Sequence, residues 1–568
     1  MVVMFLVQAL GVGALTWLLW RVFRCYIVRS PLDNIPGPPP TSFLMGHFGE
    51  LMSRDSWGFL EDICRNYGNV VKLQYLFGEK ILYISDPAAL HAMFVKEPNN
   101  FEETAEFLIG NQLLFGMSLV AASGEIHRKQ RKLLNPAFSP MHLRQLAPVF
   151  FHVAQKLRDA IAAEIKDGPK DVDMSSWSSR AALEIIGQGA MGHSLDPLTD
   201  ASPSEYAIAL RSLMPAVFAV SLHWFFIPYS PYLGSPNTRR WLLDKYPSQK
   251  AQKLKEIVDT VWNASVSIVE KRRAAISVEN GDGDGVGEEE GEREEAGKRR
   301  VGGEKDIMSI LLRANMAATE EERLPEDQLI AQVNTLIFAA SDTTSNALSR
   351  ILHTLVIHQD AQDKLRKEIK DLRKSGGGEE LTYDRLGELS YLDAVCRETL
   401  RLYPPVLSVD RIALRDTVLP LSKPILDAHG TPIQEIPIPK GTLISVGIYG
   451  FNRNKDVWGE DAEVWRPERW LERGGERDSL SASASGGVFH NLMTFAGGPR
   501  SCIGFKYAEL ELKTFLVYLI ESFKFTPSSS HNAITWNTSF IVFPSTSKDS
   551  GKAEMPVHVE LVTGAETH

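Results

Sequence analysis

The most informative ten residues of the chain run from Phe495 to Gly504 and read FAGGPRSCIG. The glycines and the proline predict a tight loop whose backbone can closely approach a flat ligand. Helix-forming residues follow from about Phe505 to Phe523, so Cys502 lies at a predicted helix N-terminus. The helix dipole and the free N–H groups there favour a thiolate, which can bind iron. The alternative is that Cys502 is only a small buried hydrophobic residue.

Composition narrows the class of protein. The chain has 568 residues, of which 44% are hydrophobic, and a net charge of -10. A large core can therefore form, and the acidic balance argues against a nucleic-acid partner. The cysteines are few, widely spaced and free of CxxC or HExxH motifs, which excludes a disulfide scaffold and the usual zinc sites. They are Cys25, Cys64, Cys396 and Cys502.

The N-terminus predicts a membrane anchor. Residues 1–20 carry no charge and would span about 30 Å as a helix. Three arginines follow before the first acid, which places that side in the cytosol. A cleaved signal peptide is the alternative, but it would need a basic start and a small-residue cleavage site. We expect a transmembrane anchor over 1–21 and a basic, proline-rich linker over 22–40, whose IPGPPP run is either a stiff support or a plain spacer.

Apolar periodicity in the rest of the chain predicts a mainly α fold with small β-sheets (α+β) in one catalytic domain, 41–568. Gly- and Glu-rich residues 280–303 predict a disordered insert, and residues 481–487 a second low-complexity insert. Core packing is the default expectation for the apolar stretch Leu213–Leu233, with a membrane contact or a substrate entrance as alternatives. The predicted elements are a hairpin of Val70–Leu76 and Ile81–Ser85, helices from Pro87 to about Val269, a long helix Pro325–His358, a helix Tyr391–Leu402, and short strands near Thr442–Ile448.

Two further motifs carry chemistry. Glu398 and Arg401 share a helix face, an arrangement that taken alone is usually a solvated pair. Residues 339–344 read AASDTT in the middle of the long helix, so Asp342 and Thr343 place an acid and a hydroxyl among apolar residues. Such a pair can relay protons, although Thr343 and Ser345 can instead bond back to the preceding turn.

Together these segments resemble the cytochrome P-450 family of haem-thiolate monooxygenases, microsomal type, and its fungal members. Residues 495–504 match FxxGxRxCxG at every fixed position, and Glu398 to Arg401 match ExxR. Residues 465–470, WRPERW, resemble the PERF segment with Trp in the last place. Residues 339–344 resemble AGxDTT with Ala340 in place of glycine, and residues 124–131 resemble the WxxxR segment with His127 in place of tryptophan.

The resemblance implies a cytochrome P-450 fold with haem b between the long central helix and the cysteine loop. Cys502 would ligate the iron, and Asp342 and Thr343 would serve catalysis. A buried structural triad would join Glu398, Arg401 and Arg469. The expected haem contacts are His127, Arg131, Arg411, Phe495, Arg500, Cys502 and Gly504; for His127 the alternative is a satisfied polar residue.

The same resemblance implies insertion of one oxygen atom from O2 into an apolar substrate, in secondary metabolism. NADPH electrons would come from a separate flavoprotein reductase, with cytochrome b5 as a further partner, at the endoplasmic reticulum membrane. The reductase would dock on Arg128, Lys129 and Lys132, or these residues are only a solvated face. The alternatives are a haem-thiolate isomerase or dehydratase acting without a reductase, and a membrane haem sensor or carrier. The pocket would draw on Phe107–Leu119, Leu213–Phe226, Phe338–Thr343, Val406–Val409 and Phe540–Val542.

Overall fold

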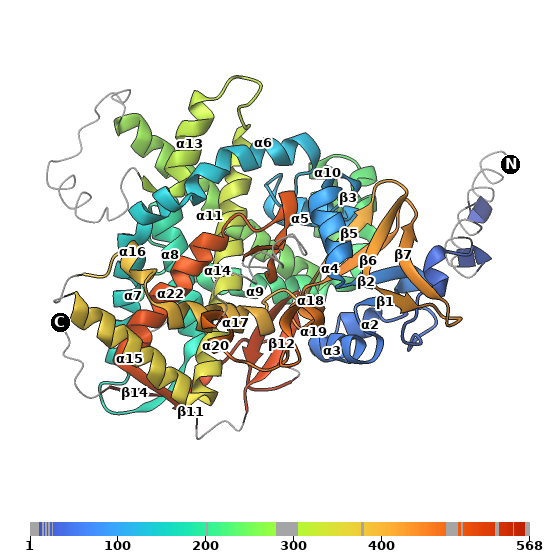
Figure 1. Ribbon diagram of the computed structural model, residues 1–568. Helices are drawn as coiled ribbons and strands as arrows, with labels where there is room; N and C mark the ends of the chain where they lie inside the picture. The colour runs from blue at the N-terminus through green and yellow to red at the C-terminus, as the bar shows by residue number, and fades with distance from the viewer. Residues whose placement is uncertain are drawn as a thin grey trace. The chain divides into compact units, whose positions relative to one another are not determined.

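The computed structural model describes residues 11–13, 16, 20, 23–24, 27–199, 203–279, 305–376, 380–472, 487–489, 492–528, 533–548 and 550–562. These residues are mainly helical with small β-sheets, as the sequence predicts (Figure 1). The chain forms two compact units. Unit 1 comprises Met1–Thr104, Val406–Val464 and Gly475–Ser501, and unit 2 comprises Ala105–Pro405, Trp465–Gly474 and Cys502–His568.

Three sequence predictions fall on residues outside this description. Most of the anchor 1–21, all of the insert 280–303 and most of the insert 481–487 belong there. Among the described residues, no single helix is long and apolar enough to cross a bilayer, while the bent pair of α9 (Glu205–Ala219) and η6 (Ser221–Leu233) reaches that length and composition together.

Unit 1 is built on a five-stranded sheet in the order β1-β2-β8-β5-β3. The predicted hairpin is confirmed, because β1 and β2 pair antiparallel from Val70 opposite Ile84. Alternating apolar residues such as Leu82, Ile444 and Val446 are fully buried and form its core. Its elements are η1 (Pro31–Asn34), α2 (Phe48–Leu51), α3 (Ser56–Tyr67), β1 (Val70–Gln74), η2 (Leu76–Gly78), β2 (Lys80–Ile84), α4 (Pro87–His91), η3 (Ala92–Lys96), η4 (Pro98–Asn100), β3 (Phe101–Glu102), β5 (Ser408–Ala413), β6 (Thr417–Leu426), β7 (Pro432–Ile438), β8 (Leu443–Gly447), α18 (Ile448–Phe451), α19 (Lys455–Trp458), β9 (Gly487–Phe489), β10 (Leu492–Gly497) and η8 (Gly498–Arg500).

The proline-rich run is more than a spacer. Ile35 is 1% exposed and packs in the core of unit 1. The N–H of Lys72 on β1 donates to the carbonyl of Pro36 at 2.9 Å. A Cβ on Gly37 would collide with the carbonyl of Lys72, so only glycine lets the run approach β1 so closely. The run is therefore fixed to the sheet.

Unit 2 is a helical layer around α14 (Glu326–Ile357), which contacts α8, α11 and α22 (Figure 1). The predicted helices 325–358 and 391–402 are confirmed to within one residue at each end, because both carry a strong apolar period between clear stops. The other elements are α5 (Ala105–Phe115), α6 (Gly124–Leu134), η5 (Asn135–Phe138), α7 (Pro140–Glu164), β4 (Lys170–Asp173), α8 (Met174–Met191), α9, η6, α10 (Pro236–Lys245), α11 (Gln249–Glu279), α13 (Ile307–Ala317), α15 (Gln359–Ser375), α16 (Tyr383–Leu386), α17 (Ser390–Leu402), α20 (Glu468–Leu471), α22 (Phe505–Ser522), β11 (Phe523–Pro527), β12 (Thr535–Ser539), β13 (Ile541–Ser545) and β14 (Pro556–Leu561).

The apolar stretch Leu213–Leu233 divides at the start of η6. Leu213 and Val217 on α9 are buried, as the core expectation requires. That expectation is wrong for η6, which has no buried residue. Pro228 and Pro231 stop a regular α-helix from continuing there, so the aromatic side chains cannot all turn inward. The exposed large side chains of η6 are Leu222, Phe226, Tyr229, Tyr232 and Leu233.

Candidate active site

The cysteine loop has the predicted form. β10 leads into the short turn η8, and Gly504 is the N-cap of α22, which begins at Phe505. Gly498 has a φ of 65° and lies so close to the carbonyl of Phe94 that a Cβ would clash with it. Both the positive φ and the close carbonyl disfavour any residue with a side chain at position 498, which explains the glycine there.

Cys502 lies two residues before Gly504, the N-cap of α22. Its residue keeps exposed surface although protein surrounds the thiol. Burial raises the pKa of Cys502 above its ordinary value, while the N–H of Gly504 and the positive charge of Arg131 act to lower it. Burial therefore disfavours ionisation of the thiol more than the helix N-terminus favours it. A metal cation at the sulfur would supply the missing stabilisation.

Asp342 and Thr343 lie in the middle of α14. The hydroxyl of Thr343 donates to the carbonyl of Ala339 at 2.7 Å, which is the bond back to the preceding turn. Burial raises the pKa of Asp342 from 3.8 to about 6, against the lowering effect of Arg211 and Asn346. An acid that titrates near neutral pH can both accept and release a proton.

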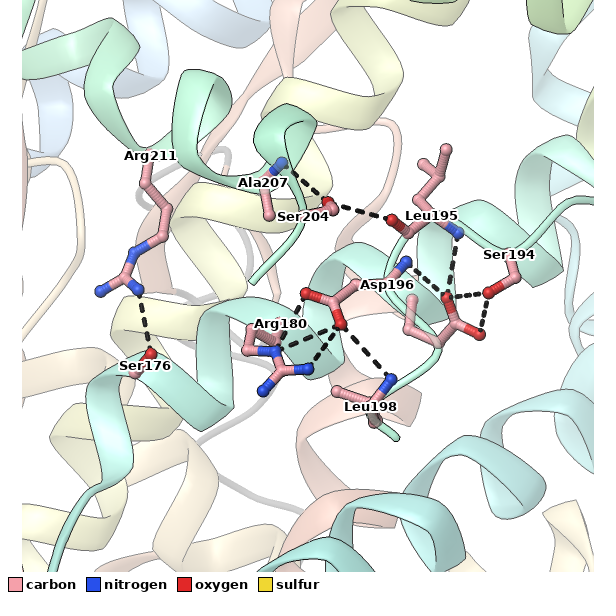
Figure 2. Close-up of polar contacts among 10 residues, drawn as sticks. Ser176, Arg180, Ser194, Leu195, Asp196, Leu198, Ser204, Ala207 and Arg211 are labelled. Carbon is pink, nitrogen blue, oxygen red and sulfur yellow. Dashed lines mark hydrogen bonds and ion pairs between the residues drawn. The ribbon is translucent and has the colours of Figure 1, made fainter. Parts of the chain in front are cut away.

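Arg211 is a charged neighbour of Asp342 that sequence reasoning missed. It donates to the hydroxyl of Ser176 at 3.1 Å and to the carbonyl of Ala553 at 3.4 Å. Figure 2 shows Arg211 on the helix α9 and Ser176 on α8. The only signal in the sequence is one arginine on an apolar helix, and no spacing relates it to Asp342.

A buried polar network fixes the segment that enters α9 (Figure 2). Arg180 and Asp196 form an ion pair at 2.9 Å with side chains 4% and 2% exposed. Glu184 accepts hydrogen bonds from the N–H groups of Leu195 and Asp196 at 3.0 and 2.9 Å. The hydroxyl of Ser204, the N-cap of α9, donates in turn to the carbonyl of Leu195 at 3.3 Å, so the start of the helix that carries Arg211 is tied to this network.

Unit 2 brings Glu398, Arg401 and Arg469 together. Arg401 donates to both carboxylate oxygens of Glu398, at 2.9 and 2.8 Å, and Arg469 donates to Oε1 at 3.3 Å. All three side chains are at most 2% exposed. Burial acts to raise the pKa of Glu398, but the two arginines and the N–H of Arg466 outweigh it and hold the pKa below its ordinary value.

Trp470 belongs to the same cluster. Its indole N–H donates to Oε2 of Glu398 at 3.0 Å, and the backbone N–H of Arg466 donates to Oε1, also at 3.0 Å. Trp470 occupies the position where the family pattern has phenylalanine, which has no N–H. The departure from the pattern was therefore the available signal for this extra donor.

The remaining expected haem contacts are distributed over both units. In unit 2, His127 is 8% exposed on α6, and Arg131 acts electrostatically on Cys502. In unit 1, Arg411 is paired with Glu103 and Arg500 with Glu102, each at 2.7 Å. Phe495 is partly buried on β10. The two glutamates were not anticipated from the sequence.

Arg128 and Lys132 on α6 are exposed and Lys129 is half-buried, and the charges of the three are largely compensated. Arg128 pairs with Glu125 at 2.7 Å and Lys132 pairs with Glu322 at 2.6 Å. Lys129 donates to the carbonyls of Glu321 and Arg323 at 2.8 and 2.9 Å. The patch is thus less positive than its sequence indicates, and Lys129 contributes its main uncompensated charge.

Three features of this chain together define a haem-thiolate protein. They are a cysteine at a helix N-terminus, a buried Glu–Arg–Arg cluster and an acid–hydroxyl pair on a long helix. The cytochrome P450 family model matches residues 36–548. Cytochrome P450 monooxygenases 91 and 212 of Postia placenta are each 45% identical to this chain, covering 96% and 97% of it and 97% and 98% of their own lengths. Ganoderic acid synthetase CYP5150L8 of Ganoderma lucidum is 39% identical over 97% of this chain and 98% of its own. The chain belongs to the cytochrome P450 family and is a cytochrome P450 monooxygenase.

The family implies a haem cofactor, and the residues present fit one. Cys502 keeps exposed surface as a residue and has one N–H donor, that of Gly504, at its thiol, and basic side chains suited to propionates are held in each unit. When bound, the haem supplies the iron at which dioxygen is reduced. Cys502 would ligate that iron, and basic side chains would hold the propionates: the candidates are His127 and Arg131 in unit 2, and Arg411 and Arg500 in unit 1.

Proposed function

We propose that the enzyme inserts one oxygen atom from O2 into an apolar small molecule, using NADPH electrons from a separate flavoprotein reductase. The observation that carries this proposal is the acid–hydroxyl pair of Asp342 and Thr343 in the middle of α14. Oxygen reduction consumes protons, and Asp342, with a pKa of about 6, can deliver them and be recharged at neutral pH. The hydroxyl of Thr343 already has a local acceptor, so it can rotate between that carbonyl and a bound group or water.

Aromatic contacts in unit 2 support an apolar substrate. Phe115 stacks on Phe338 of α14 with ring centroids 5.0 Å apart. Phe218 and Trp224 each lie 5.8 Å from the ring of Phe540, in the turn between β12 and β13. These rings come from the segments expected to form the pocket, and such walls exclude water and bind apolar molecules.

We also propose attachment to the endoplasmic reticulum membrane, with the catalytic part in the cytosol. The uncharged residues 1–20 and the arginines after them support a single anchor. The exposed aromatic side chains of η6 and Trp241 of α10 support a second contact at the bilayer surface, because Trp and Tyr favour that interface. Membrane flotation of the full chain and of a chain lacking residues 1–21 tests both contacts.

The test of the reaction uses purified enzyme in vesicles with NADPH and a microsomal flavoprotein reductase. A panel of apolar metabolites is incubated under ¹⁸O2. We expect a product that carries one labelled oxygen atom and requires both NADPH and reductase. A product formed from an organic peroxide with no reductase would instead show an isomerase or dehydratase.

A further inference from the structure

Two neighbouring acids in unit 1 hold two arginines that come from distant parts of the chain. Nη1 of Arg411 donates to Oε2 of Glu103 at 2.7 Å. Arg500 donates through Nε and Nη2 to Oε1 of Glu102 at 3.1 and 2.7 Å. The side chains of Arg411 and Glu103 are 4% and 10% exposed, and those of Arg500 and Glu102 are 13% and 22% exposed. The Arg411–Glu103 pair is therefore largely shielded from bulk water, and the Arg500–Glu102 pair is partly exposed.

The strand register explains this arrangement. β3 pairs antiparallel with β5, which places Phe101 opposite Ala413 and Glu102 opposite Ile412. Continuing the register by one residue places Glu103 opposite Arg411. Successive residues of an extended chain point to opposite faces, so Glu102 faces away from Arg411 and is free for Arg500. The N–H of Glu103 donates to Oε1 of Glu102 at 3.0 Å and fixes that carboxylate.

Both arginines keep donors for a further anion. A guanidinium group has five N–H bonds. Within the described part of the chain, Arg411 uses only Nη1, toward Glu103 and the carbonyl of Asp410, and Arg500 uses only Nε and Nη2, toward Glu102. The two arginines and two glutamates balance in charge before any ligand binds. Two ionised propionates would give the cluster an excess of negative charge.

We propose that Glu102 and Glu103 are positioning residues for the haem propionates, acting through Arg500 and Arg411. Each carboxylate aligns its arginine so that the free N–H groups meet a propionate, and the same negative charge repels that propionate. Alignment tightens haem binding and charge loosens it. The proposal rests on the haem that the family implies. It predicts that alignment of the arginines and repulsion of the propionates can be changed separately, which is not expected of residues that only stabilise the fold.

The test measures the rate of haem transfer from the full-length holoenzyme to excess apomyoglobin. In the double variant Glu102→Gln/Glu103→Gln, the amide oxygens still accept the arginine bonds and the charges are gone. We expect haem loss about 3- to 10-fold slower than in the wild type and a more positive reduction potential. Glu103→Ala removes alignment as well and should lose haem about 10-fold faster, as loss of a supporting hydrogen bond typically does.

Two controls make the result decisive. Glu97→Gln removes an exposed carboxylate of the same segment, bound to Thr417 and not to an arginine, and should leave haem loss unchanged. Haem whose two propionates are methyl esters should abolish the difference between wild type and the double Gln variant. Equal haem loss in all variants, or a difference that persists with the ester, overturns the proposal. A wild-type protein that takes up no haem would instead refute the haem assignment.

Discussion

Thr343 is the residue that most directly links the structure to oxygen chemistry. Thr343→Ala should still bind substrate and accept electrons but release hydrogen peroxide in place of product. The loss of coupling should be about 10² or more, the usual effect of a positioned proton donor, reduced where water replaces the hydroxyl. Thr354→Ala is a matched control, because Thr354 makes the same bond to the preceding turn, at 2.8 Å, on the same helix. Equal coupling in Thr343→Ala and wild type would contradict the relay.

Asp342 gives a prediction of pH dependence. Burial raises its pKa from 3.8 to about 6, so the folded protein holds this proton more strongly than the unfolded chain does. The contribution of Asp342 to stability is then full below pH 3.8 and is lost as the pH rises to about 6. Asp342→Asn should therefore be more stable than wild type at pH 7, and the advantage should shrink by pH 5. Urea unfolding at the two pH values measures it, and an advantage independent of pH would show that Asp342 does not titrate there.

Trp470 tests the polar core around Glu398. Trp470→Phe removes a hydrogen bond to a buried charged group and should lower the free energy of unfolding by about 1.5–3 kcal/mol. The control is Trp465→Phe, which removes a bond of the same length, 3.0 Å, to the neutral hydroxyl of Thr399 and should cost about 1 kcal/mol. Equal losses in urea unfolding would mean that Glu398 does not depend on the indole.

At the scale of elements, the sequence correctly predicts the helices and strands whose apolar residues repeat at a regular local spacing. The long helix 325–358, the helix 391–402 and the first hairpin are correct because their apolar residues repeat regularly between strong stops. The Glu–Arg–Arg cluster was expected from the resemblance to the family, which implies Arg469 as its third member. By contrast, the pairing of Glu103 with Arg411 depends on the register of β3 against β5, across about three hundred residues, which no local pattern contains. The place of Arg211 near Asp342 depends on tertiary packing in the same way, whereas the exposure of η6 follows locally from Pro228 and Pro231.

The ends of α11 and α13 are joined independently of the acidic insert. Nη2 of Arg272 lies 2.5 Å from Oδ2 of Asp306, and both side chains are buried. Deleting residues 280–303 and closing the gap with a short glycine linker should leave haem content and melting temperature nearly unchanged. Arg272→Ala should instead cost about 3–5 kcal/mol, because it leaves Asp306 buried without its partner. A large loss of haem on deletion would show that the insert belongs to the fold.

At the scale of the whole molecule, the electron supply depends on a surface for the reductase. Reversing Arg128, Lys129 and Lys132 to glutamate should slow reductase-dependent electron transfer and weaken its dependence on salt. The effect should come mainly from Lys129, because Glu125 and Glu322 already compensate the other two. The control reverses the exposed Lys367, Lys370 and Lys374 on α15, the same change in charge on another helix. Equal rates at low salt for the two triple variants would place the docking surface elsewhere.

Thiolate ligation by Cys502 is measured most directly by the absorption spectrum of the reduced, carbon-monoxide-treated protein. The wild type should show the red-shifted Soret band of a thiolate ligand, and Cys64→Ala and Cys396→Ala should keep it, because neither thiol lies in the cysteine loop. Cys502→Ala should lose the band, even where some haem stays bound. A Cys502→Ala protein that keeps the red-shifted band would contradict the assignment of Cys502 as the iron ligand.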